Sequence, residues 1–178
     1  MFMTNMEIII LISGILALIS LYSSKYRCHT TSPVLGFDVN KYLGKWYEIA
    51  RMPNRFENEL VNVTATYSLR KDGKIKVVNE GYKVNPNGKH KIAEGKAKFA
   101  GDPTIGYLRV SFFWFFYSDY IIVDLDSNYQ YAMVVSGKNL WILSRAPHLD
   151  KSIWEPLLQK AITLGYDTSK IYFTPQNW

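Results

Sequence analysis

The feature that most restricts the fold is a regular succession of short β-rich segments and turn signals after residue 37. Turn signals spaced about ten residues apart are typical of an antiparallel sheet whose strands are joined by hairpins. The signals combine Gly, Pro, Asn, Asp and Ser residues: Lys71-Asp72-Gly73-Lys74, Asn85-Pro86-Asn87-Gly88, Gly101-Asp102-Pro103, Asp126-Ser127-Asn128 and Ser136-Gly137-Lys138-Asn139. The segments between them predict strands at 45–53, 62–70, 75–84, 90–99, 106–113, 119–125, 129–136 and 140–145. We therefore expect an all-β fold, an eight-stranded antiparallel up-and-down β-barrel.

One amphipathic helix is expected after the eighth strand. Residues 149–164 repeat apolar side chains at helical spacing, Asp150 can cap the first turn, and Gly165 follows the last turn. A short ninth strand at residues 170–174 is expected to end the chain.

The segment before residue 37 has a different composition. Residues 8–22 are apolar except for two serines, and this length matches the hydrophobic region of a signal peptide better than a full membrane span. Glu7 precedes the run whereas Lys25 and Arg27 follow it, which reverses the charge order of a standard signal peptide. We expect a signal peptide or membrane-anchor leader at 1–28, a short linker at 29–36 and the barrel domain at 37–178.

Cys28 is the only cysteine, so the chain cannot form an intramolecular disulfide. It follows the apolar run at the place where a bacterial lipoprotein carries its lipidated cysteine. Small apolar residues normally precede such a cysteine, whereas Lys25-Tyr26-Arg27 precede this one. Lipidation at Cys28 and an unmodified thiol in the leader therefore both remain as hypotheses.

Residue alternation in the predicted fourth strand favours a barrel with internal space. Ala93, Gly95 and Ala97 share one face of this strand, and lysines and a glutamate occupy the other. A barrel of about eight strands is just wide enough to be filled by its own side chains or to hold one small ligand. Small inner residues favour a ligand cavity, and a core filled by bulky side chains from neighbouring strands is the alternative.

Three motifs resemble those of the lipocalin family. Residues 43–51 look like the first motif, a Gly-x-Trp after a short helical turn; Leu125-Asp126 with residues 129–134 is similar to the second, and residues 141–147 to the third. Within the family, three further segments resemble the bacterial branch, which includes outer-membrane lipoproteins: residues 55–57, 63–69 and 91–99. The resemblance runs from Phe37 to the C-terminus and implies a calyx-shaped barrel followed by a helix.

The resemblance assigns structural roles to Gly44, Trp46, Asp126 and Arg145. In the family the motif tryptophan lies across the closed floor of the barrel, and the arginine before the helix packs on its indole face. A partly desolvated cation over an indole contributes about 2 kcal/mol. The open mouth is then expected at the other end, at the connections 52–61, 84–90, 112–119 and 136–140.

Six consecutive aromatic residues, from Phe112 to Tyr117, fall at this expected mouth. Related bacterial lipocalins tend to have a Gly-Pro turn where this chain has Trp114-Phe115. We expect these two side chains to contact a membrane interface or an entering acyl chain. A lid folded over the neighbouring loops is the alternative.

Basic residues are concentrated next to the mouth. Residues 70–98 contain nine Lys or Arg and three Asp or Glu, a net charge of +6. This excess suits an anionic membrane surface or a lipid with a phosphate or carboxylate headgroup, although solubility alone also explains outward lysines. No nucleic-acid partner is expected, because no binding module of that kind is recognised.

No catalytic or metal-binding constellation is visible. The only cysteine lies in the leader, and the three histidines, at 29, 90 and 148, show no pairing or metal-ligand spacing. We therefore expect no enzyme activity, no cofactor and no metal site. Glu48 shares the parity of Trp46, so we expect an interior carboxylate that can anchor a ligand headgroup.

These observations predict a carrier or store for a hydrophobic ligand, namely a fatty acid, lysophospholipid or phospholipid. The bacterial resemblance implies export to the cell envelope, in the outer membrane or periplasm, with a link to membrane maintenance or stress. The predicted ligand-binding residues are Glu48, Ala65, Tyr67, Val77, Asn79, Ala97, Phe99, Leu108, Val110, Phe112, Tyr131 and Trp141, the last of which matches a ligand-contacting tryptophan in an animal member of the family. The alternative is a filled barrel whose aromatic rim docks onto another envelope protein or a second copy; a homodimer remains open.

Overall fold

The computed structural model of the chain describes residues 31–54, 57, 59–84 and 88–177. The predictions for residues 1–28, including lipidation at Cys28, lie outside the described residues. None of the helices in the described part has the length and apolar character needed to cross a membrane.

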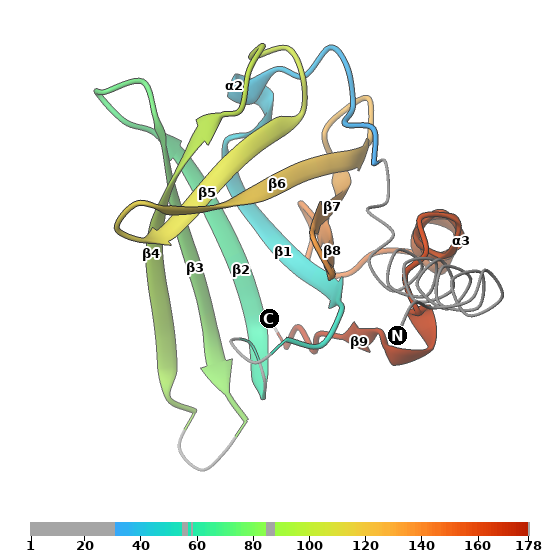
Figure 1. Cartoon of the computed structure of the whole chain (residues 1–178). Coiled ribbons are helices and arrows are strands. Elements are labelled where there is room, and N and C mark those ends of the chain that lie inside the picture. Colours follow the sequence, from blue (N-terminus) through green and yellow to red (C-terminus); the bar gives the residue numbers. More distant parts are fainter. Residues whose placement is uncertain (1–30, 55–56, 58, 85–87, 178) are drawn as a thin grey trace, which may run out of the picture. The chain divides into compact units, whose positions relative to one another are not determined.

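Eight antiparallel strands form a closed barrel, as the sequence predicts (Figure 1). The strands are β1 (Gly44–Arg51), β2 (Leu60–Leu69), β3 (Ile75–Lys83), β4 (His90–Phe99), β5 (Tyr107–Phe113), β6 (Phe116–Leu125), β7 (Tyr131–Ser136) and β8 (Asn139–Ser144). Each strand pairs with its neighbours in sequence, and β1 pairs with both β2 and β8, which closes the sheet. The largest difference from the predicted bounds is at β6, which starts at Phe116 rather than at residue 119.

The predicted helix is α3 (Lys151–Thr163). Asp150 caps it, because its Oδ1 accepts a hydrogen bond of 2.8 Å from the backbone N–H of Ser152. Gly165 follows the helix at φ +86°, a conformation that glycine adopts without steric cost. A 3₁₀ turn, η1 (Thr168–Lys170), leads to β9 (Tyr172–Phe173), which pairs with β1. A short helix, α2 (Val39–Tyr42), precedes β1.

The barrel has a closed end and a mouth. Alternate hairpins lie at alternate ends of an up-and-down barrel, so the β1–β2, β3–β4, β5–β6 and β7–β8 connections share one end. We call this end the mouth. The remaining hairpins lie at the other end together with α2, which is the closed end (Figure 1).

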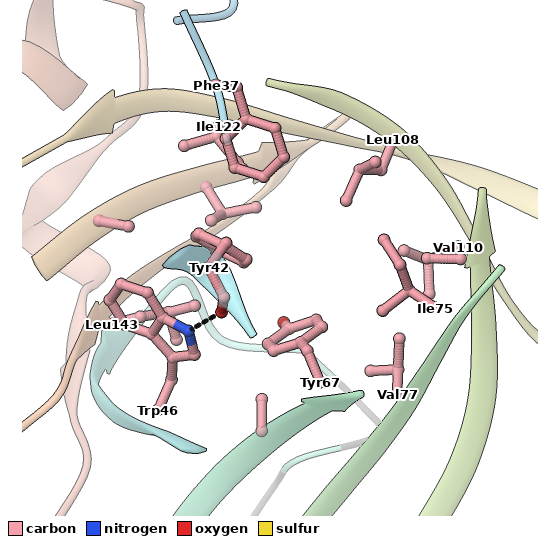
Figure 2. Close-up of a cluster of buried hydrophobic side chains, with 14 of the residues drawn as sticks. Phe37, Tyr42, Trp46, Tyr67, Ile75, Val77, Leu108, Val110, Ile122 and Leu143 are labelled. Atoms are coloured by element: carbon pink, nitrogen blue, oxygen red, sulfur yellow. Dashed lines mark hydrogen bonds between the residues drawn. The ribbon is translucent and has the colours of Figure 1, made fainter. Parts of the chain in front are cut away.

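Two apolar clusters occupy the two faces of the sheet. The inner cluster includes Trp46, Tyr67, Val77 and Leu108 (Figure 2). The outer cluster packs α3, through side chains such as Leu157, against the outside of β1, β6, β7 and β8. Helix α3 therefore covers the outer face of the barrel at these four strands.

Strand β7 contributes to both clusters. Ala132 and Val134 belong to the inner cluster, whereas Met133 and Val135 belong to the outer one, and Tyr131 packs against the outer one. Tyr131 therefore lies on the face opposite to the predicted ligand wall. Because apolar side chains line both faces of β7, its sequence has no polar alternation that distinguishes inside from outside.

Candidate ligand site in the barrel

The closed floor is built on Trp46, whose side chain is fully buried. Its indole Nε1 donates a 2.8 Å hydrogen bond to the backbone carbonyl of Tyr42 in α2 (Figure 2). The Arg145 guanidinium lies 3.9 Å from the centre of the indole ring, and burial lowers its pKa. Arg145 also donates hydrogen bonds of 2.8 Å to three backbone carbonyls, those of Lys41, Leu43 and Lys45. One side chain thus ties α2 to the start of β1.

Two other motif residues, Gly44 and Asp126, fix the backbone conformation at the closed end. Gly44 has φ +94°, and a Cβ at this position would come within 3.3 Å of Arg145 Nη1. Asp126 Oδ2 accepts hydrogen bonds of 3.0 Å and 3.1 Å from the N–H groups of Asn128 and Gln130, which fixes the β6–β7 turn.

A chain of three tyrosine hydroxyls lies above the floor. The Tyr120 hydroxyl is 2.8 Å from those of Tyr42 and Tyr67. Burial raises the pKa of Tyr67 to about 12 and that of Tyr42 and Tyr120 well above the usual value, so all three are neutral at physiological pH. The three hydroxyls have three hydrogen atoms, and the two hydrogen bonds between them use two. One O–H therefore remains to donate to a group other than these tyrosines.

Asn79 adds a second polar group to the inner wall. It lies opposite Ala65 on β2 and Ala93 on β4, neither of which has a polar side chain. Its Oδ1 is buried and has no hydrogen-bond partner among the described residues. An unpaired buried acceptor costs roughly 1–3 kcal/mol, so this amide favours a partner within the barrel.

The inner face is packed near the floor and open near the mouth. Directly paired residues share a face, so Ala93 faces inward with Asn79, and Ser118 faces inward with Val110. Both Ala93 and Ser118 are exposed, whereas Leu108 near the floor is fully buried. Solvent therefore reaches the inner wall in the half of the barrel next to the mouth.

Most of the predicted ligand-binding residues line this interior. Six are buried in the inner cluster, and two more are partly buried against it: Ala65, Tyr67, Val77, Ala97, Leu108 and Val110, with Phe99 and Trp141. Phe112 is 45% exposed, and its ring lies beside Gly95, where a Cβ would come within 2.8 Å of Phe112 Cδ1. Glu48 lies on the inner face of the barrel, but its carboxylate is bound by Arg51 and Thr174.

Glu48 belongs to a buried polar network. Its Oε1 lies 2.5 Å from Arg51 Nη1 and accepts a 2.5 Å hydrogen bond from the Thr174 hydroxyl. Glu57, in the β1–β2 connection, accepts a hydrogen bond of 3.1 Å from Trp141 Nε1 and also contacts Arg51. Burial, and next the Glu57 carboxylate, raise the pKa of Glu48 to about 7, while Arg51 and Thr174 act in the opposite direction.

This network holds chain segments together. Glu48 and Arg51 are each 3% exposed. The Gln176 amide donates to the backbone carbonyls of Glu48 and Val63, so the C-terminal segment bridges β1 and β2 where the two strands separate. Glu48 therefore anchors the mouth loop and the C-terminus, and its Oε1 is already occupied.

The sequence did not predict the parts that Arg51, Glu57 and Thr174 play in this network. Residues three apart on a regular strand point to opposite faces, so the sequence predicts no contact between Glu48 and Arg51. A β-bulge between Glu48 and Ala50 shifts the register and brings both side chains to one face.

The comparisons with known proteins agree with this geometry. A family model described as Lipocalin-like domain matches residues 37–176, and the chain belongs to the lipocalin family. The outer membrane lipoprotein Blc of Vibrio cholerae is 45% identical over 151 residues, which cover 83% of this chain and 87% of that protein. Apolipoprotein D of Macaca fascicularis is 34% identical over 158 residues, covering 83% and 82%.

Solved structures support the fold. Insecticyanin from the tobacco hornworm Manduca sexta superposes with a TM-score of 0.68, at 24% identity, over 83% of this chain and 85% of that one. Lipocalins are generally binding and transport proteins, and membership implies a small hydrophobic ligand. No group of three or more His, Cys, Asp or Glu side chains in the described residues could hold a metal ion.

Proposed function

We propose that this protein carries or stores a single-chain lipid, a fatty acid or lysophospholipid, in the cell envelope. The observation that carries the proposal is the inner wall next to the mouth, where Ala93, Gly95 and Ser118 face inward and are reached by solvent. Beside them the wall carries small or β-branched apolar side chains such as Ala65 and Val77. An acyl chain fits such a surface because it needs apolar contacts along its length and few hydrogen bonds.

Polar groups inside the barrel support a ligand with one hydrogen-bonding end. The Asn79 amide oxygen has no hydrogen-bond partner among the described residues, and the three tyrosine hydroxyls leave one O–H unused between them. A carboxylate or phosphate oxygen can accept the tyrosine O–H, and a ligand hydroxyl can also donate to the Asn79 amide oxygen. The Glu48 carboxylate is a weaker anchor for a headgroup, since Arg51 and Thr174 already bind it.

The cellular location follows from the relatives. Proteins named outer membrane lipoprotein Blc from two bacterial species are 44–45% identical to this chain. This similarity, with the apolar segment at residues 8–22, supports a function in the envelope and a leader at residues 1–28 that exports or anchors the protein. A link to membrane maintenance under stress is part of the same proposal.

Burial of roughly ten methylene groups at ~0.8 kcal/mol each gives a gross gain of about 8 kcal/mol. Immobilising the ligand reduces this gain, so micromolar dissociation constants are expected.

A fluorescence titration tests the proposal. Delipidated full-length protein is titrated with a long-chain fatty acid and with a lysophospholipid, following tryptophan emission. Trp141 belongs to the inner wall, whereas Trp154 packs on Phe173 outside the barrel. The response should saturate, disappear in Trp141→Phe and persist in Trp154→Phe. Absence of saturable binding of either lipid would refute the assignment.

The filled-barrel alternative is less well supported. A barrel filled by its own side chains would bury its inner residues along the whole length, and Ala93 and Ser118 are exposed. The exposed aromatic rim that this alternative needs is present at the β5–β6 hairpin.

A further inference from the structure

The β5–β6 hairpin ends in four exposed aromatic rings, Phe113, Trp114, Phe115 and Phe116, which we call the aromatic tip. Their side chains are between 64% and 76% exposed. Phe113 pairs with Phe116 across the hairpin, and Trp114 turns the chain at φ +49°. This backbone conformation costs a non-glycine residue about 1 kcal/mol or more. The turn therefore exposes the Trp114 and Phe115 rings at some cost in stability. Because the β5–β6 hairpin belongs to the mouth, the aromatic tip lies at its rim.

The rings of the aromatic tip contact one another. Phe113 stacks on Trp114 and on Phe116 with centroids 6.5 Å and 6.3 Å apart, and Phe115 lies 4.7 Å from Phe116. The high exposure argues against a lid folded over the neighbouring loops. Of the eleven exposed large hydrophobic residues in the described part, five lie on this hairpin, one on β4 and one in the β3–β4 connection at the mouth: Phe112, Phe113, Trp114, Phe115 and Phe116, then Ile92 and Val84. Apolar exposure concentrated in this way marks an interaction surface.

The hairpin turn has a side-chain donor for its backbone carbonyls. The Ser111 hydroxyl lies 3.3 Å from the Phe113 carbonyl and 3.4 Å from the Trp114 carbonyl, so it can donate to either from inside the turn. An unpaired carbonyl in hydrocarbon would cost far more than one in water. Ser111 is itself buried, so its hydroxyl can donate to a carbonyl of the exposed turn from inside the hairpin.

Cationic side chains lie at the base of the aromatic tip. Lys98 and Lys96 place their ammonium groups 4.7 Å and 6.0 Å from the centre of the Tyr117 ring. Arg109 donates a 3.4 Å hydrogen bond to the Tyr117 carbonyl and has Asp119 as its acidic neighbour at 3.7 Å. Lys96 and Lys98 belong to residues 70–98, which carry a net charge of +6, and Arg109 lies on the next strand, β5.

We propose that the aromatic tip inserts into the interface of an anionic lipid bilayer, while Lys96, Lys98 and Arg109 contact the headgroup phosphates. Trp and Phe rings favour the boundary between headgroups and acyl chains, and basic residues beside them are attracted to anionic lipid. Insertion turns the mouth toward the bilayer. This inference concerns where the protein docks, and it holds whichever ligand the barrel carries.

The first test is sedimentation with vesicles of phosphatidylcholine, with and without about one third phosphatidylglycerol. Full-length protein is compared with the double variant Trp114→Ser/Phe115→Ser and with Leu69→Ser, which removes a 52% exposed side chain at the closed end. All three proteins share residues 1–30, so any effect of that segment cancels. The double variant should bind the anionic vesicles about tenfold or more weakly, whereas Leu69→Ser should bind like the parent.

The second test measures insertion at the aromatic tip itself. Vesicles of brominated lipid quench tryptophans that enter the bilayer, and Trp114 should provide the quenched part of the emission. In Trp114→Phe this part should disappear while vesicle binding persists, because a phenyl ring still inserts. Lys96→Gln/Lys98→Gln should weaken binding to anionic vesicles and leave binding to neutral ones unchanged, with Lys151→Gln on α3 as the control.

Two results would overturn the proposal. One is equal vesicle binding by the parent and the double variant, with Trp114 emission unaffected by brominated lipid. The other is a parent protein that self-associates through the aromatic tip, so that the double variant becomes monomeric without any change in vesicle binding; this would assign the surface to a second copy. In the absence of vesicles the double variant should bind fatty acid as the parent does, which separates failure of docking from failure of the carrier function.

Discussion

At the scale of single residues, Arg145 does the most to join separate segments. Its guanidinium covers the Trp46 ring and donates to carbonyls on α2, on β1 and in the β6–β7 turn. The planar group meets these acceptors in fixed directions while one face stays on the indole, which an ammonium group does not reproduce.

We therefore expect Arg145→Lys to lower the free energy of unfolding by about 2–4 kcal/mol, although it keeps the charge. Arg109→Lys, at an exposed position with the same charge, is the control and should change stability by less than about 0.5 kcal/mol. Urea denaturation of the three proteins measures both effects. Equal stability of Arg145→Lys and the parent would show that charge alone matters at this position.

Glu48 should make stability depend on pH. Its pKa is about 7 in the folded protein, above its usual value of 4.5, so the folded state keeps a proton that the unfolded state releases between these values. Stability from this group is therefore fully present below about pH 4.5 and is lost as the pH rises through 7. The cause is burial beside Glu57, which Arg51 only partly compensates.

Comparison with Glu48→Gln isolates this effect. As the pH rises from 5 to 7.5, the parent should lose unfolding free energy relative to Glu48→Gln. Both proteins carry the same exposed aspartates, whose lowered pKa values act at more acidic pH, so these contributions cancel. A difference that stays constant over this range would mean that Glu48 is ionised throughout.

At the scale of secondary-structure elements, the sequence predicts strands well where one face is polar. The β4 bounds, residues 90–99, are as predicted, because small and charged residues alternate from residue 93 to residue 98. The sequence predicts Tyr131 on the ligand-facing side of β7, whereas it packs on the outer side, because apolar clusters cover both faces of that strand. The start of β6 was missed because Trp114 closes a tight turn at positive φ without glycine, and the aromatic run then continues as strand.

Helix α3 is expected to stabilise the barrel without taking part in ligand binding. Leu157→Ala removes a buried side chain of the outer cluster and should cost about 2–4 kcal/mol of stability. Ile162→Ala, on an exposed part of the same helix, should cost much less. The affinity for lipid should stay the same in both variants at temperatures where they are folded. A large loss of affinity in Leu157→Ala would show that α3 shapes the interior.

At the scale of the whole molecule, the closed floor and the open half of the barrel have different tasks. The motif residues around Trp46 fix the floor, and the family resemblance revealed them because their types and spacing are specific. The polar network of Glu48, Arg51 and Thr174 was not predictable, since it depends on a β-bulge and on a contact between residues 126 positions apart. Long-range polar contacts of this kind leave no periodic signal in the sequence.

The central claim is that the half of the barrel next to the mouth holds a lipid, and native mass spectrometry with added fatty acid or lysophospholipid tests it most directly. Ala93→Trp places a large ring on the open inner wall, and Ile92→Trp places the same ring on the outer face of the same strand. The parent and Ile92→Trp should each bind one lipid per chain, and Ala93→Trp should bind none or much less. Equal lipid binding by Ala93→Trp and the parent would contradict the claim that the ligand lies inside the barrel.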